Sequence, residues 1–171
     1  MTIRSLGDKI PKVAPSAWVS EAAYVVGDVE IGEGSSVWPG AVLRGDFCKI
    51  RVGARTHIED NCVVHSGDFV DIGDDVLVGH AVVLHCRSVG NNCLLANHAT
   101  LLDDAVIGDL CLVAAGALVL PGTVVPSGSF VSGLPAVVRP AKEEHIARLR
   151  AQNRQDVGYG AMMLEYKNAG L

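Results

Sequence analysis

Residues 89–131 read VGNNCLLANHATLLDDAVIGDLCLVAAGALVLPGTVVPSGSFV. In this stretch an aliphatic residue returns at every sixth position: Val89, Leu95, Leu101, Ile107, Val113, Val119, Val125 and Val131. A period of six fits neither an amphipathic helix nor a single alternating strand. It fits hexads that each hold one short strand and one tight turn, with the aliphatic side chain pointing inward. Hexapeptide repeats of this kind are a sequence signature of a parallel β-helix, so we predict an all-β solenoid.

The same phase extends toward the N-terminus, with three interruptions. It is carried there by Val13, Val19, Val25, Ile31, Val37, Leu43, Val52, Ile58, Val64, Ile72, Val78 and Leu84. The interruptions separate Leu43 from Val52 by nine residues, Val64 from Ile72 by eight and Leu84 from Val89 by five. Loops and bulges on a rigid scaffold are common positions for functional residues. We therefore expect the functional site near these interruptions.

The composition limits the class of protein. The chain has 171 residues, of which 49% are hydrophobic and only 5% aromatic, and its formal net charge is −5. The high hydrophobic content excludes an intrinsically disordered chain, and the lack of a basic cluster argues against nucleic-acid binding. No apolar run is long enough for a membrane helix, and the first residues do not resemble a signal peptide. We therefore expect a soluble, cytoplasmic protein whose five cysteines are buried thiols.

The repeat ends after Val131, which suggests a division of the chain. We expect a β-helix domain over residues 1–139 and a C-terminal helical segment over residues 140–171. Residues 132–140 are rich in turn formers and are predicted to be an extended crossing. A proline at its start, acidic residues early and basic residues late favour a helix from Ala141 to about Gln155.

This helix is expected to pack alongside the coil. Ile146 and Leu149 would lie on its buried face, and such a helix caps or flanks a solenoid without taking part in chemistry. A weaker helix is predicted over Met162 to Tyr166, with a break near Gly158 and Gly160.

Two histidines occupy the same place in their hexads. His65 follows Val64 and His85 follows Leu84. If three hexads make one triangular turn of about 18 residues, the interval from His65 to His85 is one turn plus the two-residue slip. The two imidazoles should therefore stack on adjacent turns, roughly 4.8 Å apart at the backbone. That spacing suits two ligands of one metal ion.

His80 lies on the preceding hexad and on a different face of the triangle. It cannot easily reach an ion held by His65 and His85, but a neighbouring coil could supply it. The pattern thus suggests a symmetric homo-oligomer, most simply a trimer, with the metal at the interface. Three histidine ligands would leave one position open for water, as in catalytic zinc sites. The competing interpretation is that these are surface histidines on turns, and it is the preferred one for His57, His98 and His145.

Four segments together resemble the γ-class carbonic anhydrase family. They are Val37-Trp-Pro-Gly-Ala-Val-Leu-Arg-Gly-Asp46, Gly53-Ala-Arg-Thr-His-Ile-Glu-Asp60, Val63-Val-His65 and Val78-Gly-His-Ala-Val-Val-Leu-His85. The resemblance covers nearly the whole chain, and the histidine pair with four residues between its members, after an earlier Val-Val-His, is its most specific part.

The resemblance implies a left-handed parallel β-helix, a homotrimer and a metal site. The metal ligands that the resemblance implies are His65, His80 and His85, with His80 coming from the adjacent subunit. The metal would be zinc, iron(II) or cobalt(II). Arg44 and Asp46 match the family's intersubunit ion pair beside the site. Tyr159 matches a tyrosine of the terminal helix that lies over the site in the family.

The chain departs from the family pattern near the site. Around residues 56–60 the family usually has Thr-Asn-Ile-Gln-Asp, whereas this chain has His57 for the Asn and Glu59 for the Gln. The resemblance implies that a Gln at this position orients the metal-bound water, and an ionised Glu cannot donate the hydrogen bond that a Gln can. The best-known active members of the family carry glutamates for proton transfer where this chain has Phe47 and a short loop, residues 66–71. The acidic residues of that loop are Asp68 and Asp71, which we interpret as surface residues.

The leading functional hypothesis is a metal-dependent carbonic anhydrase. Its site residues would be Glu59, Arg44, Asp46 and Tyr159 beside the three metal ligands, and hydroxide formed at the metal would attack carbon dioxide to give bicarbonate. Because the shuttle glutamates are missing, slow or buffer-dependent turnover is expected. Two alternatives stay open. One is an acyltransferase or thioesterase that uses a histidine as general base, and the other is a catalytically weak, metal-binding trimeric scaffold.

Overall fold

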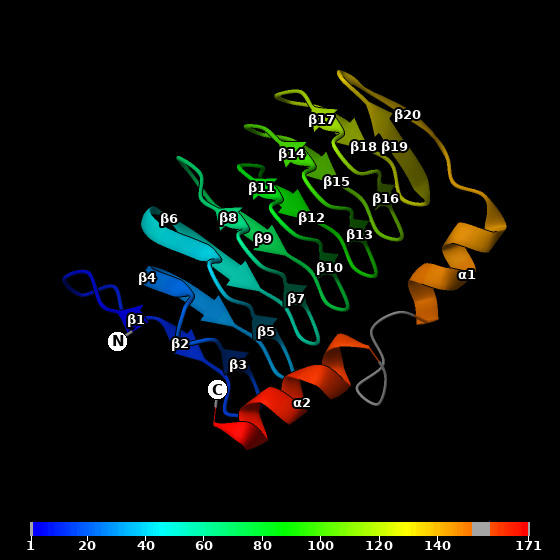
Figure 1. Cartoon of the computed structure of the whole chain (residues 1–171). Helices are drawn as coiled ribbons and strands as arrows, with labels where there is room; N and C mark the ends of the chain where they lie inside the picture. Colours follow the sequence, from blue (N-terminus) through cyan, green and yellow to red (C-terminus); the bar gives the residue numbers. More distant parts are fainter. Residues whose placement is uncertain (1, 152–157, 171) are drawn as a thin grey trace.

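The computed structural model describes residues 2–151 and 158–170, and it shows a β-solenoid followed by two helices (Figure 1). The predicted parallel β-helix with a C-terminal helix alongside is confirmed. Its elements are β1 (Ile3–Arg4), β2 (Lys12–Val13), β3 (Trp18–Val19), β4 (Tyr24–Ile31), β5 (Ser36–Val37), β6 (Val42–Val52), β7 (His57–Ile58), β8 (Val63–Val64), β9 (Val70–Ile72), β10 (Leu77–Val78), β11 (Val83–Leu84), β12 (Ser88–Val89), β13 (Leu94–Leu95), β14 (Thr100–Leu101), β15 (Val106–Ile107), β16 (Leu112–Val113), β17 (Leu118–Val119), β18 (Val124–Val125), β19 (Ser129–Gly133), β20 (Ala136–Pro140), α1 (Glu143–Ala151) and α2 (Tyr159–Ala169).

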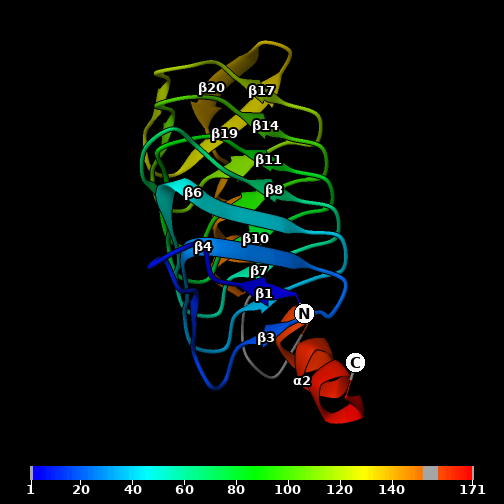
Figure 2. The same ribbon diagram turned by 90° about the vertical axis from the view of Figure 1, so that its left-hand side faces the viewer.

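Each turn of the coil places a short strand on each of three faces. One face is an eight-stranded sheet in the order β20-β19-β16-β13-β10-β7-β5-β3. The other two faces join into one twelve-stranded sheet, because β4 and β6 run around the corner between them. Figure 2 shows the turns stacked one above the next. Neighbouring strands pair in parallel, except that β19 and β20 pair antiparallel.

The inward position of each hexad forms the core. Aliphatic residues such as Leu43, Ile58, Leu84 and Leu101 have no exposed surface there. The other inward positions hold small residues, including the five cysteines, all of which are free and buried. The predicted buried thiols are therefore confirmed.

Three turns depart from the regular length of three hexads. A regular turn leads from Leu95 to Val113, which are paired residues of β13 and β16. The turn from Val37 to Ile58 and the turn from Ile58 to Val78 are both longer than this. The next turn, from Val78 to Leu95, is shorter. The three interruptions of the sequence pattern thus change the length of three consecutive turns without disturbing the stacking of the core.

The first interruption forms a bulge in β6. Pairing between β4 and β6 shifts register after Gly27, which lies opposite Gly45, and resumes where Val29 lies opposite Ile50. Gly27 has a φ of +85°, and a Cβ atom there would collide with the carbonyl oxygen of Gly45. Only glycine fits this close approach. The bulge contains Asp46 and the exposed Phe47.

The C-terminal segment differs in detail from the prediction. The crossing over residues 132–140 pairs antiparallel with the last turn as the β19–β20 hairpin. Helix α1 begins at Glu143, and Ile146 and Leu149 are buried, as predicted. Its predicted end near Gln155 lies outside the described residues. The expected break at Gly160 was wrong, because α2 runs from Tyr159 and Gly160 is buried within it.

Helix α2 returns the chain to the first turns of the coil. Met163 packs there with Trp18 and Trp38, and the tyrosines of α2 lie against the same cluster. The ammonium of Lys167 donates hydrogen bonds to the carbonyl oxygens of Pro15 and Ala17 at 2.8 and 3.2 Å. The two ends of the chain consequently lie near the same end of the molecule (Figure 2). Among the helices described, neither is long and apolar enough to span a bilayer.

Candidate metal centre

The imidazoles of His65 and His85 lie one above the other on adjacent turns. Val64 and Leu84, which precede them, are paired residues of β8 and β11. The His65 amide donates to the carbonyl oxygen of Leu84 at 3.0 Å, and the two ring centroids are 5.5 Å apart. The stacking expected from the hexad register is therefore present.

A carboxylate lies at each end of this histidine pair. On the turn before His65, Oδ1 of Asp46 lies 3.0 Å from Nε2 of His65. On the turn after His85, Oδ1 of Asp103 lies 3.0 Å from Nδ1 of His85. Four consecutive turns thus contribute a column of side chains, Asp46–His65–His85–Asp103, which we call the histidine column.

Arg44 and Asp46 form an ion pair at one end of the column. Desolvation raises the pKa of Asp46, but hydrogen bonds from the Phe47 amide, Arg44 and His65 together outweigh it and hold the pKa at about 2. The main-chain carbonyl of Asp46 also accepts a hydrogen bond from Lys9. Asp46 is therefore an anion under physiological conditions, with its position fixed by several contacts.

His80 lies away from the column, at the corner after β10. Its Nε2 is 2.9 Å from Oε2 of Glu59, and its Nδ1 is 3.1 Å from Oδ2 of Asp60. The side chain is 45% exposed. Within residues 2–151 and 158–170, no three side chains of the kind that ligate metals converge. A single chain thus brings together His65 and His85 but not His80, as expected from the hexad positions.

Glu59 is buried between the coil and α2. Its side chain is 5% exposed and accepts a hydrogen bond from the hydroxyl of Tyr159. Burial raises the pKa of Glu59, and the hydrogen bond from Tyr159 and the nearby His80 only partly offset this effect. The pKa of Tyr159 is also raised. Burial is the largest cause, and the hydrogen bond to Glu59 is the next. Glu59, Tyr159 and His80 therefore form one connected polar group.

His57 is the other departure from the family pattern, and its expected position on the surface was wrong, because the side chain is buried. Its Nδ1 lies 2.7 Å from Oγ of Ser36, which accepts a hydrogen bond from Nε1 of Trp38 at 2.7 Å. A hydroxyl has one donor and two acceptor lone pairs, so Ser36 also satisfies Nδ1 of His57 in either tautomer of the ring. Burial lowers the pKa of His57 to about 4. This histidine is a neutral, structural group near Tyr159, with ring centroids 6.0 Å apart.

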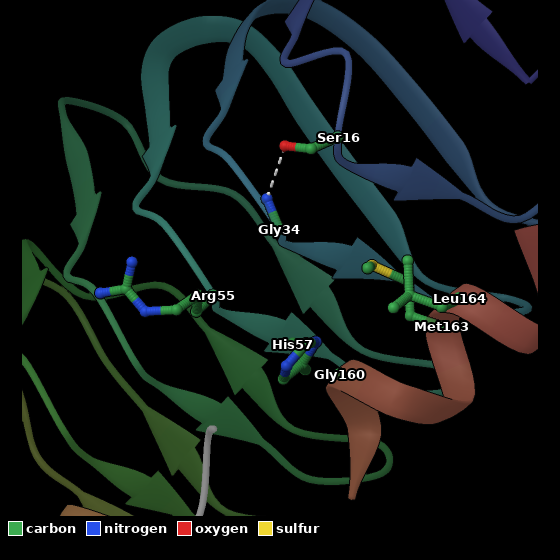
Figure 3. Close-up of a pocket in the computed structure, with 7 residues that line it drawn as sticks. All are labelled: Ser16, Gly34, Arg55, His57, Gly160, Met163 and Leu164. Atoms are coloured by element: carbon green, nitrogen blue, oxygen red, sulfur yellow. Dashed lines mark hydrogen bonds between the residues drawn. The ribbon is translucent and has the colours of Figure 1, made fainter. Parts of the chain in front are cut away.

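A pocket of about 180 Å³ opens beside His57 under α2 (Figure 3). Its lining comprises Ser16, Gly34, Arg55, His57, Gly160, Met163 and Leu164. Arg55 is paired with Asp75 through two hydrogen bonds of 2.7 Å, and Ser16 accepts one from the Gly34 amide at 3.0 Å. The pocket therefore lacks a free charge among its described lining residues, and it does not reach the histidine column.

The remaining candidate residues lie apart from these groups or at their edge. Asp71 forms an ion pair with Arg51 at 2.6 Å, and Asp68 lies in the loop after His65. Phe47 is 76% exposed, with its ring 6.2 Å from that of His65. His98 occupies a turn position with a φ of 61°, and His145 lies on α1 against Phe130.

The donor set of the histidine column fits a divalent transition metal. Imidazole nitrogens are ligands that zinc, iron(II) and cobalt(II) share. Each of His65 and His85 has one nitrogen beside a carboxylate, which is the usual outer partner of a metal-binding histidine. His65 and His85 could therefore hold such an ion if a third ligand came from outside the chain.

Sequence reasoning missed three partners of the site, Asp103, Asp60 and Ser36. Asp103 lies one residue beyond the register position of His85, because Leu84 pairs with Leu101 and Leu102 therefore lies opposite His85. The register rule that stacked the histidines therefore does not identify Asp103, whose contact with His85 comes from its side chain. Asp60 and Ser36 contact His80 and His57 through side-chain conformations, which hexad spacing does not specify.

Comparisons with known proteins agree with this geometry, although no protein-family model matches the chain. A probable carbonic anhydrase of Methanocaldococcus jannaschii is 44% identical over 158 residues, which cover 91% of this chain and 99% of that protein. The mitochondrial γ carbonic anhydrase 1 of Arabidopsis thaliana is 44% identical over 155 residues, 85% of this chain. The chain spans only about half of that plant protein, 56% of its length.

A solved structure shares the whole architecture. The hexapeptide transferase family protein of Anaplasma phagocytophilum superimposes with a TM-score of 0.90 and 38% sequence identity, over 96% of this chain and 98% of that one. The repeat, the stacked histidines and the sequence identity over nearly full length lead to one assignment. The chain belongs to the γ-class carbonic anhydrase family of hexapeptide-repeat proteins.

Proposed function

We propose that this protein is a metal-dependent carbonic anhydrase that interconverts carbon dioxide and bicarbonate. The observation that carries the proposal is the stacking of His65 and His85 on adjacent turns, 5.5 Å apart between ring centroids, in a chain with carbonic anhydrase relatives. The metal would be zinc, iron(II) or cobalt(II). When bound, it supplies Lewis acidity, which lowers the pKa of water toward about 7.

The proposed enzyme is a homotrimer with the site at each subunit interface. His65 and His85 of one chain would hold the ion together with His80 of a second chain. Two features support this arrangement: one chain does not bring the three histidines together, and His80 is 45% exposed on another face of the coil. Cyclic symmetry then gives identical sites at all interfaces.

The neighbouring residues would position groups and move protons. Asp46, held by Arg44, would fix the ring of His65. Glu59, held by Tyr159, would accept a hydrogen bond at the site and orient the attacking water. Because no glutamate occupies the family's shuttle positions, we expect buffer to carry the proton to solvent and turnover to depend on its concentration.

We also propose that the protein resides in the cytoplasm. Its five cysteines are free and buried, which is typical of a protein in a reducing compartment. The plant relative is described as mitochondrial, so fractionation of the source cells, with the protein followed by antibody, is the appropriate measurement. Recovery of the protein in an organelle or outside the cell would contradict this location.

A second candidate function is acyl transfer. It is favoured by the likeness to the hexapeptide transferase family protein of Anaplasma phagocytophilum. Such an enzyme would need a histidine as general base but no metal triad. A non-catalytic, metal-stabilised scaffold is the third possibility.

Stopped-flow hydration of carbon dioxide distinguishes these functions. The protein would be loaded anaerobically with iron(II) or zinc, and His85→Ala would be the control. Metal-dependent hydration that disappears in His85→Ala is the expected result. A fully metal-loaded trimer without hydration activity would overturn the proposal and turn the search to acyl donors, thioesters or binding partners.

A further inference from the structure

His85 is held between two side chains from the turns on either side of it. His65 lies on one side, with ring centroids 5.5 Å apart, and Asp103 on the other, with Oδ1 3.0 Å from Nδ1 of His85. The backbone holds the two turns against each other, because the amide of His85 donates to the carbonyl oxygen of Leu101 at 2.9 Å and Leu101 pairs with Leu84. This register places Leu102 opposite His85, and Asp103, the next residue, reaches the ring through its side chain.

This contact decides which nitrogen of His85 carries the proton. An ionised carboxylate accepts hydrogen bonds and cannot donate them. The proton of a neutral His85 ring is therefore on Nδ1, and the lone pair on Nε2 is left available. A metal ligand needs such a lone pair, and a carboxylate on the other nitrogen fixes the tautomer and makes the ligand more basic.

We propose that Asp103 is the positioning residue of His85, which selects the Nδ1-protonated tautomer and orients the ring for metal binding through Nε2. The metal part of this inference rests on the proposed function. Asp103 is 60% exposed, and exposed ion pairs contribute little to folding stability. Its substitution should therefore affect metal affinity and tautomer while leaving the thermal midpoint of the metal-free protein unchanged.

The chain offers a matched control in the next residue. Asp104 is also exposed and carries the same charge, but no contact with His85 involves it among the described residues. Its φ of 57° is well tolerated by asparagine. Asp103→Asn and Asp104→Asn thus change the net charge equally at neighbouring positions, and only the first alters the contact with His85.

The tautomer can be measured without metal or activity. Histidine-labelled, chelator-treated protein at pH 8 would be studied by long-range proton–nitrogen NMR correlation. The wild-type protein and Asp104→Asn should show the Nδ1-protonated ring of His85, and Asp103→Ala should shift it toward the Nε2-protonated form. An Nε2-protonated His85 in the wild-type protein would overturn the proposal.

Zinc affinity, measured by competition with a chelator, is the second readout. Asp103→Ala should bind zinc about 10-fold to 100-fold more weakly, Asp103→Asn should recover part of this loss, and Asp104→Asn should match the wild type. Equal affinities in Asp103→Ala and Asp104→Asn would overturn the role of Asp103. Wild-type protein that binds zinc but does not hydrate carbon dioxide would overturn the proposed function alone, and a failure to bind zinc would overturn both.

Discussion

The hydroxyl of Ser36 lies 2.7 Å from Nδ1 of His57, and the ring of His57 is almost entirely buried beneath α2. This relationship fixes a neutral histidine in the place where the family pattern has asparagine. Burial lowers its pKa to about 4, well below the ordinary value of 6.5. His57 consequently makes the folded state sensitive to acid.

Acid should destabilise the protein less when His57 is replaced. Between pH 6.5 and pH 4 the unfolded chain binds a proton at this residue and the folded chain does not, so stability falls as the pH falls. The loss amounts to about 3 kcal/mol at the acidic end. His57→Asn should remove it. Thermal midpoints at pH 7 and pH 4.5 measure this, and an unchanged difference between the two pH values in the variant would contradict the burial effect.

Loss of the Tyr159 hydroxyl should lower carbon dioxide hydration. Tyr159→Phe removes a hydrogen bond to buried Glu59, and a loss of about 1 kcal/mol at this group would lower the rate at most about fivefold. Tyr166→Phe is the control, because Tyr166 lies in the same helix and packs its ring 5.1 Å from that of Trp38. Zinc content should stay equal in both variants. Equal activity losses would show that the effect comes from packing of α2 and not from Glu59.

Two glycine substitutions distinguish the cost of a positive φ from the cost of a steric clash between the new Cβ atom and the backbone. Gly27→Ala places a Cβ against the Gly45 carbonyl at a φ of +85°, so β6 must move and the thermal midpoint should fall strongly. Gly116→Ala has a similar φ of +67° but open space around the Cβ, and it should cost only about 1 kcal/mol. Because β6 carries Arg44 and Asp46, only Gly27→Ala should also weaken zinc binding. Equal midpoints for the two variants would exclude the close approach as the cause.

Two inactive variants should restore activity when mixed. His80→Ala subunits retain His65 and His85, while His85→Ala subunits retain His80. If the site combines histidines of two chains, co-refolded trimers of both variants regain activity in about a quarter of their sites. Hydration rates of the mixture and of each variant alone provide the measurement. No recovery in a mixed trimer verified by mass spectrometry would place all three histidines in one chain.

The sequence predicts the coil well because the aliphatic residues that recur every six positions are the ones that point into the core. It also predicts the stacking of His65 and His85, since residues at the same hexad position lie on one column once slips are counted. The rule does not extend to Asp103, because the register places Leu102 opposite His85 and Asp103 reaches the ring only through its side chain.

Other features depend on contacts that spacing does not encode. Glu59 meets His80 and Tyr159 through side-chain conformations and through the return of α2 from far along the chain. Gly160 has a low helix propensity, yet packing of α2 on the coil overrides it. The left hand of the coil was implied by family resemblance and could not be derived from the period of six.

The return of α2 to the first turns links the number of repeats to the length of the C-terminal segment. Tyr159 must reach Glu59, while the strand that precedes the helices ends at the opposite end of the coil. Each additional turn would lengthen the coil by roughly 4.8 Å, a distance that about three helical residues span. Duplication of a repeat would therefore separate Tyr159 from Glu59 unless the C-terminal segment grew in step, so the two regions can change length during evolution only together.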